Sequence, residues 1–251
     1  MKFLRTHIPN AITSLNLFSG LTAIYLSFHG QLAAAAFCII AAAVFDFFDG
    51  MAARLLKSNN IIGKDLDSLA DVVSFGAAPA FIIVHLKSYY YSIHPAEASP
   101  NYLHISFYEE QIMVFAFIMV VFSAIRLAIF NNDTRQSTSF IGVPTPANAL
   151  FIISFALIAN YQPQYFPISV IENAWMVGGI CLFLSYMLVS PLPLFALKFK
   201  QWGFKGNEVR YLFVAAAAVL ILLFKFVAIP IVIVLYVLTS LILNFAKKPN
   251  V

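Results

Sequence analysis

Long apolar runs, separated by short polar intervals, recur along the whole chain. A helix that crosses a bilayer needs about 20 consecutive, mostly apolar residues. Scanning for such runs predicts about eight transmembrane helices and therefore an all-α, polytopic integral membrane protein. Their expected bounds are about Ala11–Phe28, Gln31–Leu56, Leu69–Leu86, Gln111–Phe130, Ala147–Ala159, Ala174–Ser190, Tyr211–Val227 and Ile229–Phe245. The fifth run is short, and only Lys225 and Pro230 divide the last two, which are expected to form a tight hairpin.

The composition agrees with this fold class. Of the 251 residues, 61% are hydrophobic and 10% are charged, and the mean hydropathy is +0.87. Cys38 and Cys181 both fall inside predicted spans, where they are interpreted as buried packing residues. Two isolated cysteines make neither a metal site nor a disulfide framework.

Basic residues are divided unequally between the two sides of the membrane that eight spans create. One side carries only Lys87 and Lys225. The other carries Lys2, Arg5, Arg54, Lys57, Lys64, Arg126, Arg135, Lys198, Lys200, Lys205, Arg210, Lys247 and Lys248. Basic loops stay on the cytoplasmic side, so both termini are expected to face the cytoplasm from the cell membrane. The net charge of +4 then indicates contact with anionic membrane lipids, and no basic–aromatic pattern indicates nucleic acid binding.

One polar interval has a pattern of its own. The stretch PLPLFALKFKQWGFKG, Pro191–Gly206, alternates apolar and basic residues between the sixth and seventh predicted spans. This pattern predicts a helix that lies in the cytoplasmic membrane interface.

Four aspartates beside an apolar run require an explanation: Asp46, Asp49, Asp67 and Asp71. An aspartate inside a bilayer costs roughly 2.5–3.5 kcal/mol on insertion scales. On helices, the first two are three residues apart and the last two are four apart, so each pair shares a face. The intervening KSNNIIGK contains turn signals. We therefore expect two helices to form a hairpin that brings both faces together at its cytoplasmic end.

Small residues and an arginine follow the first pair of aspartates. Gly50 comes directly after Asp49, and Ala53 lies one turn further along, so a ligand can approach the backbone closely. Arg54 lies just over two turns beyond Asp46, near the same face, where a guanidinium can grip a phosphate with two hydrogen bonds.

Carboxylate oxygens around an open position suit Mg²⁺ or Mn²⁺, which in turn hold substrate phosphates. Two such ions would offset four carboxylates, and a two-metal site suits displacement at phosphorus. Three other interpretations remain open from the residues alone. The carboxylates could form interfacial salt bridges with Arg54, Lys57 and Lys64, or the ion site of a cation transporter, which would lie at mid-membrane in broken helices. They could also bind a diphosphate through Mg²⁺ in a membrane prenyltransferase.

The residues from Asp46 to Asp71 read Asp-x2-Asp-Gly-x2-Ala-Arg-x8-Gly-x3-Asp-x3-Asp. This spacing resembles the signature of the CDP-alcohol phosphatidyltransferase family, whose members attack a CDP-linked lipid with a hydroxyl-bearing acceptor and release CMP. Prenyltransferase motifs lack the Gly-x2-Ala-Arg continuation. The resemblance implies a divalent cation cofactor, Mg²⁺ or Mn²⁺, two per active site. It also implies a homodimer, since family members are commonly homodimers.

The same resemblance implies a role for each motif residue. Asp46, Asp49 and Asp67 would be metal ligands, and Asp71 would help to hold the second ion and act as the general base. Gly50, Ala53 and Arg54 would line the CDP site, with Arg54 on the diphosphate. One transmembrane domain, 1–251, is expected, with a catalytic core at about 8–190 and an additional C-terminal hairpin at about 208–246.

The segment PNAITSLN, Pro9–Asn16, resembles the family's entry to the first helix. By that resemblance Asn10, Thr13 and Asn16 would contribute to the nucleotide site. Helix capping and interhelical hydrogen bonding are the alternative explanation for these three side chains.

Two further segments resemble the phosphatidylserine synthase branch of the family: Ser68–Ala80 and Phe140–Ala149. Asn148 stands where the second alanine of the branch's PAA pattern is expected. The resemblance implies CDP-diacylglycerol and L-serine as substrates. A glycerol 3-phosphate or inositol phosphate acceptor, or an archaeal-type ether lipid donor, remains the alternative.

The carboxylate of an L-serine acceptor needs a cation. Arg126, at the end of the fourth predicted span, and Arg135, in the following loop, are the candidates for acceptor binding. An anchor that snorkels to the interface and a plain loop charge are the respective alternatives.

Overall fold

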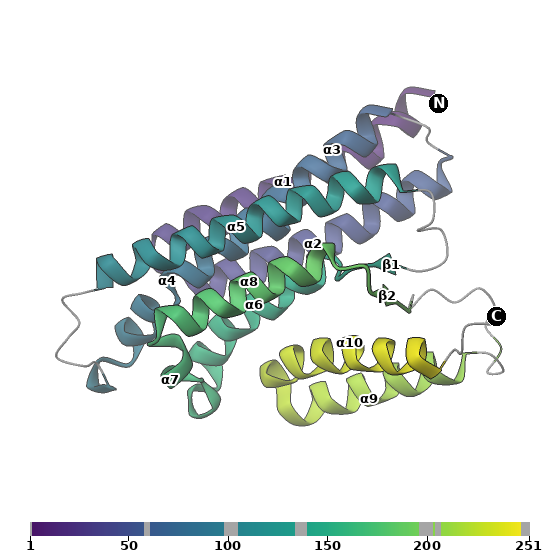
Figure 1. Ribbon diagram of the computed structural model, residues 1–251. Coiled ribbons are helices and arrows are strands. Elements are labelled where there is room, and N and C mark those ends of the chain that lie inside the picture. The colour runs from purple at the N-terminus through teal and green to yellow at the C-terminus, as the bar shows by residue number, and fades with distance from the viewer. Residues whose placement is uncertain are drawn as a thin grey trace.

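The computed structural model describes residues 2–57, 61–97, 105–133, 140–195, 203 and 207–246 (Figure 1). Its α-helices are α1 (Lys2–Phe28), α2 (Leu32–Leu55), α3 (Ile61–Asp71), α4 (Ala78–Ile93), α5 (Ile105–Asn132), α6 (Thr145–Tyr161), α7 (Ile168–Ile171), α8 (Ala174–Val189), α9 (Glu208–Phe224) and α10 (Ala228–Ala246). A π-helical segment, η1 (Val72–Ala77), joins α3 to α4. The short 3-10 helices are η2 (Pro95–Glu97), η5 (Pro163–Tyr165) and η6 (Lys225–Val227).

The predicted fold class, an all-α polytopic membrane protein, is confirmed. Within the described residues, five stretches are long and apolar enough to cross a membrane: His7–Phe28, Leu32–Leu55, Ile62–Ile93, Phe107–Asn132 and Glu208–Asn244. The last of these contains both α9 and α10. The shorter apolar helices α6 and α8 have 17 and 16 residues, or about 25 Å each, slightly less than the hydrocarbon thickness of a bilayer.

The third predicted span differs most from the structure. Helix begins at Ile61 rather than Leu69 and continues through η1 to Ile93. The first turns of α3 carry exposed Lys64 and Asp65, which a search for apolar runs excludes although they extend the same helix. The wide π turn begins directly after Asp71.

Helix α1 packs against α2, α3 and η1 and thereby joins the two aspartate-bearing helices. Its contact with η1 is close because Gly20 has no side chain. A Cβ at Gly20 would lie 2.3 Å from Ser74 Oγ. Ser74 Oγ in turn donates a hydrogen bond to the backbone oxygen of Asn16 at 3.0 Å. This contact fixes the position of α1 along its own axis relative to the end of α3.

Helices α9 and α10 form the expected hairpin, with η6 at its tip. Figure 1 shows that α1 begins, α2 ends, α3 begins and α10 ends at the same end of the molecule. This end is called the aspartate end below, because Asp49 and Asp67 lie near it.

The stretch Pro191–Gly206 was predicted to be helical, and the prediction is wrong where the structure describes it. Strand β2 (Pro193–Leu194) pairs antiparallel with β1 (Phe140–Ile141). Pro191 and Pro193 lack the N–H groups that a helix needs, and proline favours an extended residue before it. Residues 196–202 and 204–206 lie outside the described part of the chain.

Candidate active site

Three of the predicted metal ligands meet between α2 and α3. One carboxylate oxygen from each of Asp46, Asp49 and Asp67 lies within 4.8 Å of the other two. Asp49 is 5% exposed. Asp49 Oδ2 and Asp67 Oδ1 are buried and have no hydrogen-bond partner among the described residues. Buried polar atoms are usually paired, so this cluster has the chemistry of an oxygen-rich cation site.

The fourth aspartate is not part of the set within 4.8 Å, but the charges of the other three act on it. Asp71, at the end of α3, is 7% exposed. Its Oδ1 accepts a hydrogen bond of 3.1 Å from Nδ2 of Asn16, which is itself fully buried on α1. Asn16 therefore orients the Asp71 carboxylate and leaves its second oxygen available to another partner.

A cavity of about 230 Å³ opens beside the carboxylates, lined by Pro9, Asn10, Thr13, Asp49, Gly50, Ala53, Gly63, Lys64 and Asp67. The structure thus brings together two predicted nucleotide-site residues of α1, Asn10 and Thr13, with the small residues of α2. The space beside Gly50 is open, since an added Cβ would meet only Arg54 Nη2, at 4.0 Å. A phosphate-bearing ligand can therefore approach the α2 backbone here.

Arg54 is placed differently from its neighbours. Its side chain is exposed, and Nε donates to the backbone oxygen of Gly50 at 2.9 Å. Arg54 is not among the residues that line the cavity. The cation that does line it, Lys64, was counted only as a cytoplasmic charge in the sequence; its Nζ also donates to the backbone oxygen of Asn131 at 2.7 Å.

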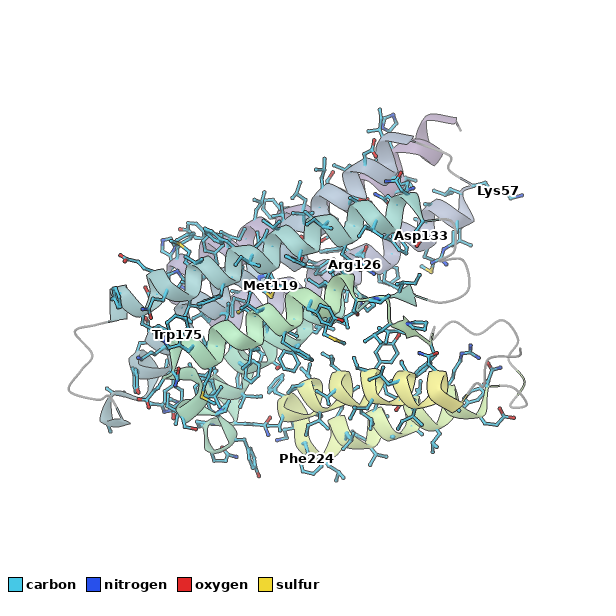
Figure 2. All side chains as sticks on the ribbon, viewed as in Figure 1. Lys57, Met119, Arg126, Asp133, Trp175 and Phe224 are labelled. Carbon is cyan, nitrogen blue, oxygen red and sulfur yellow. The ribbon has the colours of Figure 1, made fainter. Side chains whose placement is uncertain are left out.

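Arg126 lies inside the bundle on α5 and is 7% exposed (Figure 2). Its Nη1 donates to Thr145 Oγ1 at 3.5 Å. Its Nε is buried and has no partner among the residues that the structure describes, and the charges of Asp71 and Asp46 act on the guanidinium. This position does not suit an anchor that reaches the membrane surface. Arg135, the second acceptor candidate, lies outside the described residues.

The geometry also bears on the alternative explanations of the aspartates. Within the described residues, none of the four forms a salt bridge with lysine or arginine. Asp46 and Asp49 lie in the last three turns of an unbroken α2, whereas a transporter site is expected at mid-membrane in broken helices. The arrangement favours a site for a phosphate-bearing ligand near one membrane surface.

Comparison with known proteins decides the family. The family model described as CDP-alcohol phosphatidyltransferase matches residues 6–191. The chain belongs to this family. It is therefore a membrane-embedded transferase of phospholipid biosynthesis, as the motif from Asp46 to Asp71 predicted.

Several curated proteins are similar to this member of the family. A CDP-diacylglycerol–serine O-phosphatidyltransferase of Helicobacter pylori is 31% identical over 199 residues, which cover 78% of this chain and 75% of the relative. An archaetidylserine synthase of Methanothermobacter thermautotrophicus is 34% identical over 157 residues, with coverages of 62% and 60%. A Bacillus subtilis CDP-diacylglycerol–serine O-phosphatidyltransferase is 31% identical over 188 residues, with coverages of 74% and 88%.

Proposed function

We propose that this transferase moves the phosphatidyl group from CDP-diacylglycerol to the hydroxyl of L-serine, giving phosphatidylserine and CMP. The names of the similar proteins from bacteria support serine as the acceptor. The observation that carries the proposal is the meeting of Asp46, Asp49 and Asp67 beside a cavity that reaches α1. An ether-linked donor is the second candidate, because an archaetidylserine synthase is also similar.

The carboxylates fit a divalent cation, Mg²⁺ or Mn²⁺. The supporting observation is the pair of buried, unpartnered oxygens, Asp49 Oδ2 and Asp67 Oδ1, since both ions prefer oxygen ligands. Asp46, Asp49 and Asp67 would hold the ion, and Asp71 would help to hold a second one. Such ions polarise the phosphoryl group and stabilise the charge that develops on CMP.

Side chains of the protein would bind and orient the donor. Asn10, Thr13, Gly50 and Ala53 would surround the CDP moiety, and Asn16 would hold Asp71 in place. Arg54 would bind the diphosphate after exchanging its hydrogen bond to Gly50, since a guanidinium matches phosphate oxygens with two donors.

Acceptor activation would fall to Asp71 and acceptor binding to Arg126. Asp71 would take the proton from the serine hydroxyl through its free oxygen, as a general base must lie within hydrogen-bonding reach of that proton. Arg126 would bind the serine carboxylate with its unpartnered Nε, and the adjacent Asp71 would then be close to the hydroxyl. Arg135 remains a second proposed contact.

The test is CMP release from CDP-diacylglycerol by the purified protein in detergent. Serine, glycerol 3-phosphate and inositol phosphate are compared side by side. Serine should give the highest kcat/KM, and Arg126→Gln should raise the KM for serine while leaving the KM for CDP-diacylglycerol unchanged. Faster CMP release with a phosphorylated acceptor would overturn the serine assignment and leave the family unaffected.

We further propose that the protein lies in the cytoplasmic membrane with both termini in the cytoplasm, as a homodimer. The concentration of basic residues on the side of the termini supports the orientation. Protease accessibility of tags at either end, in intact cells and in inverted vesicles, tests it.

A further inference from the structure

The hairpin α9–α10 lies outside the segment that matches the family model, residues 6–191, yet it is fixed to the core at both ends. At its tip, where Figure 2 shows Phe224, Gln162 Nε2 donates to the backbone oxygen of Phe224 at 3.1 Å, and Gln162 Oε1 accepts from Phe226 N at 2.9 Å. Towards the aspartate end, Tyr236 Oη donates to the backbone oxygen of Phe195 at 2.8 Å, and Asn244 Nδ2 donates to the backbone oxygen of Pro193.

Between these two attachments, α10 leaves a cavity of about 390 Å³ against α6 and α8. It extends from Ile233 to Leu241 along α10, which is about 12 Å of helix. Its lining residues are Val143, Asn148, Phe151, Ile180, Phe183, Leu184, Met187, Leu192, Ile233, Val234, Val237, Leu238 and Leu241. All but Asn148 are apolar. Phe183, Val234 and Leu238 in this lining are 60%, 48% and 50% exposed, so the cavity opens to the outer face of the helices. An apolar, open cavity of this length suits a hydrocarbon chain.

Asn148 gives the cavity one polar corner. It is 1% exposed, and within the part of the chain that the structure describes neither Nδ2 nor Oδ1 has a hydrogen-bond partner. It lies one turn beyond Thr145 on α6, and Thr145 is the residue that contacts Arg126. A buried amide without a partner is rare. The polar corner therefore lies two side chains away from the carboxylates of the active site, at the end of the cavity beside β1 and β2.

We propose that this cavity binds one hydrocarbon chain of the CDP-diacylglycerol donor, with the ester carbonyl of that chain accepting a hydrogen bond from Asn148 Nδ2. The inference rests on the proposed function for the identity of the donor. The connection from Asn148 through Thr145 to Arg126 favours the donor, and the phosphatidylserine formed from it, over membrane lipids whose headgroups do not enter the active site. The hairpin thus forms one wall of the lipid-binding site.

Filling the cavity tests the proposal. Ile233→Trp adds bulk on the α10 wall and Ile180→Phe adds it on the α8 wall. Leu222→Trp is the matched control, because Leu222 is 80% exposed on α9. Binding of dioctanoyl and dipalmitoyl CDP-diacylglycerol is measured by calorimetry with Mg²⁺ and without an acceptor. Partitioning of the donors into micelles is common to all variants and cancels in the ratio.

Both cavity-filling variants should weaken binding of the dipalmitoyl donor at least about tenfold relative to the control and change binding of the dioctanoyl donor much less. Equal losses for both donors, or no loss in either variant, would overturn the proposal. Asn148→Leu should weaken both donors about fivefold, as loss of one hydrogen bond predicts. Size-exclusion profiles show whether each variant is folded, and the two walls supply independent tests.

Two further results separate this proposal from its alternatives. Native mass spectrometry of delipidated protein measures retention of dipalmitoyl phosphatidylglycerol. If Ile233→Trp abolishes that retention and leaves donor binding intact, the cavity belongs to a structural lipid and the proposal is wrong. The calorimetric experiment contains no acceptor, so failure of serine as a substrate leaves its outcome unchanged.

Discussion

Replacing Asp67 by asparagine should have opposite effects on the metal-free and metal-bound protein. At a separation of 4.8 Å, two unit negative charges repel each other by about 0.9 kcal/mol in bulk water and about 3.5 kcal/mol at an effective dielectric constant of about 20. Asp67 has two such neighbours, Asp46 and Asp49, so Asp67→Asn removes about 2–7 kcal/mol of repulsion. Without a cation, the variant should therefore be more stable than the wild type.

The assay is thermal unfolding of the purified protein in detergent, in EDTA and with added Mg²⁺ or Mn²⁺. The wild type should be stabilised by the cation, because ligand binding to the native state raises its stability. Asp67→Asn should unfold at a higher temperature than the wild type in EDTA, show little response to the cation and release no CMP. Asp65→Asn, which changes an exposed carboxylate on the same helix, is the control and should behave as the wild type. A lower unfolding temperature of Asp67→Asn in EDTA, or a full response to Mg²⁺, would refute the shared cation site.

Three other substitutions test the proposed general base, the proposed diphosphate contact and the attachment of the hairpin tip. Asp71→Asn should keep metal-dependent binding of CDP-diacylglycerol in calorimetry and lose about 10²–10⁴-fold in serine turnover. Loss of donor binding would instead show that the main role of Asp71 is to bind the metal. Arg54→Lys should raise the KM for CDP-diacylglycerol more than Arg210→Lys does, because an ammonium cannot reproduce the two-donor contact with phosphate, and equal kinetics would exclude the diphosphate role. Gln162→Leu should lower the free energy of unfolding by about 1 kcal/mol, since it removes part-buried hydrogen bonds to the backbone of the hairpin tip. An unchanged denaturation midpoint would show that this contact does not stabilise the hairpin.

The local spacing of residues predicted which of the motif side chains lie close together. Aspartates three and four residues apart share a helix face, and small residues beside them leave open space, so Asp46, Asp49, Asp67 and Gly50 meet as the spacing indicated. The spacing could not distinguish Asp71 from the other three aspartates. What distinguishes Asp71 is its hydrogen bond from Asn16, which is far away in the sequence and reaches Asp71 through the packing of α1.

Other features of the structure could not be predicted from the residues that are nearby in the sequence. Lys64 lines the cavity, but its place in the sequence resembles that of any basic residue at a helix start. The departure at Asn148 was visible in the sequence, whereas its burial without a partner depends on how α6 and α8 pack. Gln162 precedes a proline and reads as a loop residue; its role depends on a hairpin tip that lies 62 residues further along the chain. Hydropathy alone also misplaced the start of the third span. A helix can continue beyond the hydrocarbon layer of the membrane with polar residues, and a search for apolar runs does not detect that part of it.

The wide turn η1, directly after Asp71, has a consequence for how this protein can change over evolution. A π-helical turn contains one residue more than the corresponding α-helical turn, and one residue corresponds to a rotation of about 100°. The wide turn therefore accommodates one extra residue while the Asp67–Asp71 face and the buried face of α4 keep their directions. Deletion of a single residue between Val72 and Ala77 could be absorbed by conversion of η1 to regular α-helix, with α4 and α3 each keeping its own partners. The same deletion inside α3 or α4 would turn one of these faces away from its neighbours, so a one-residue deletion in η1 should be tolerated better than one in either flanking helix.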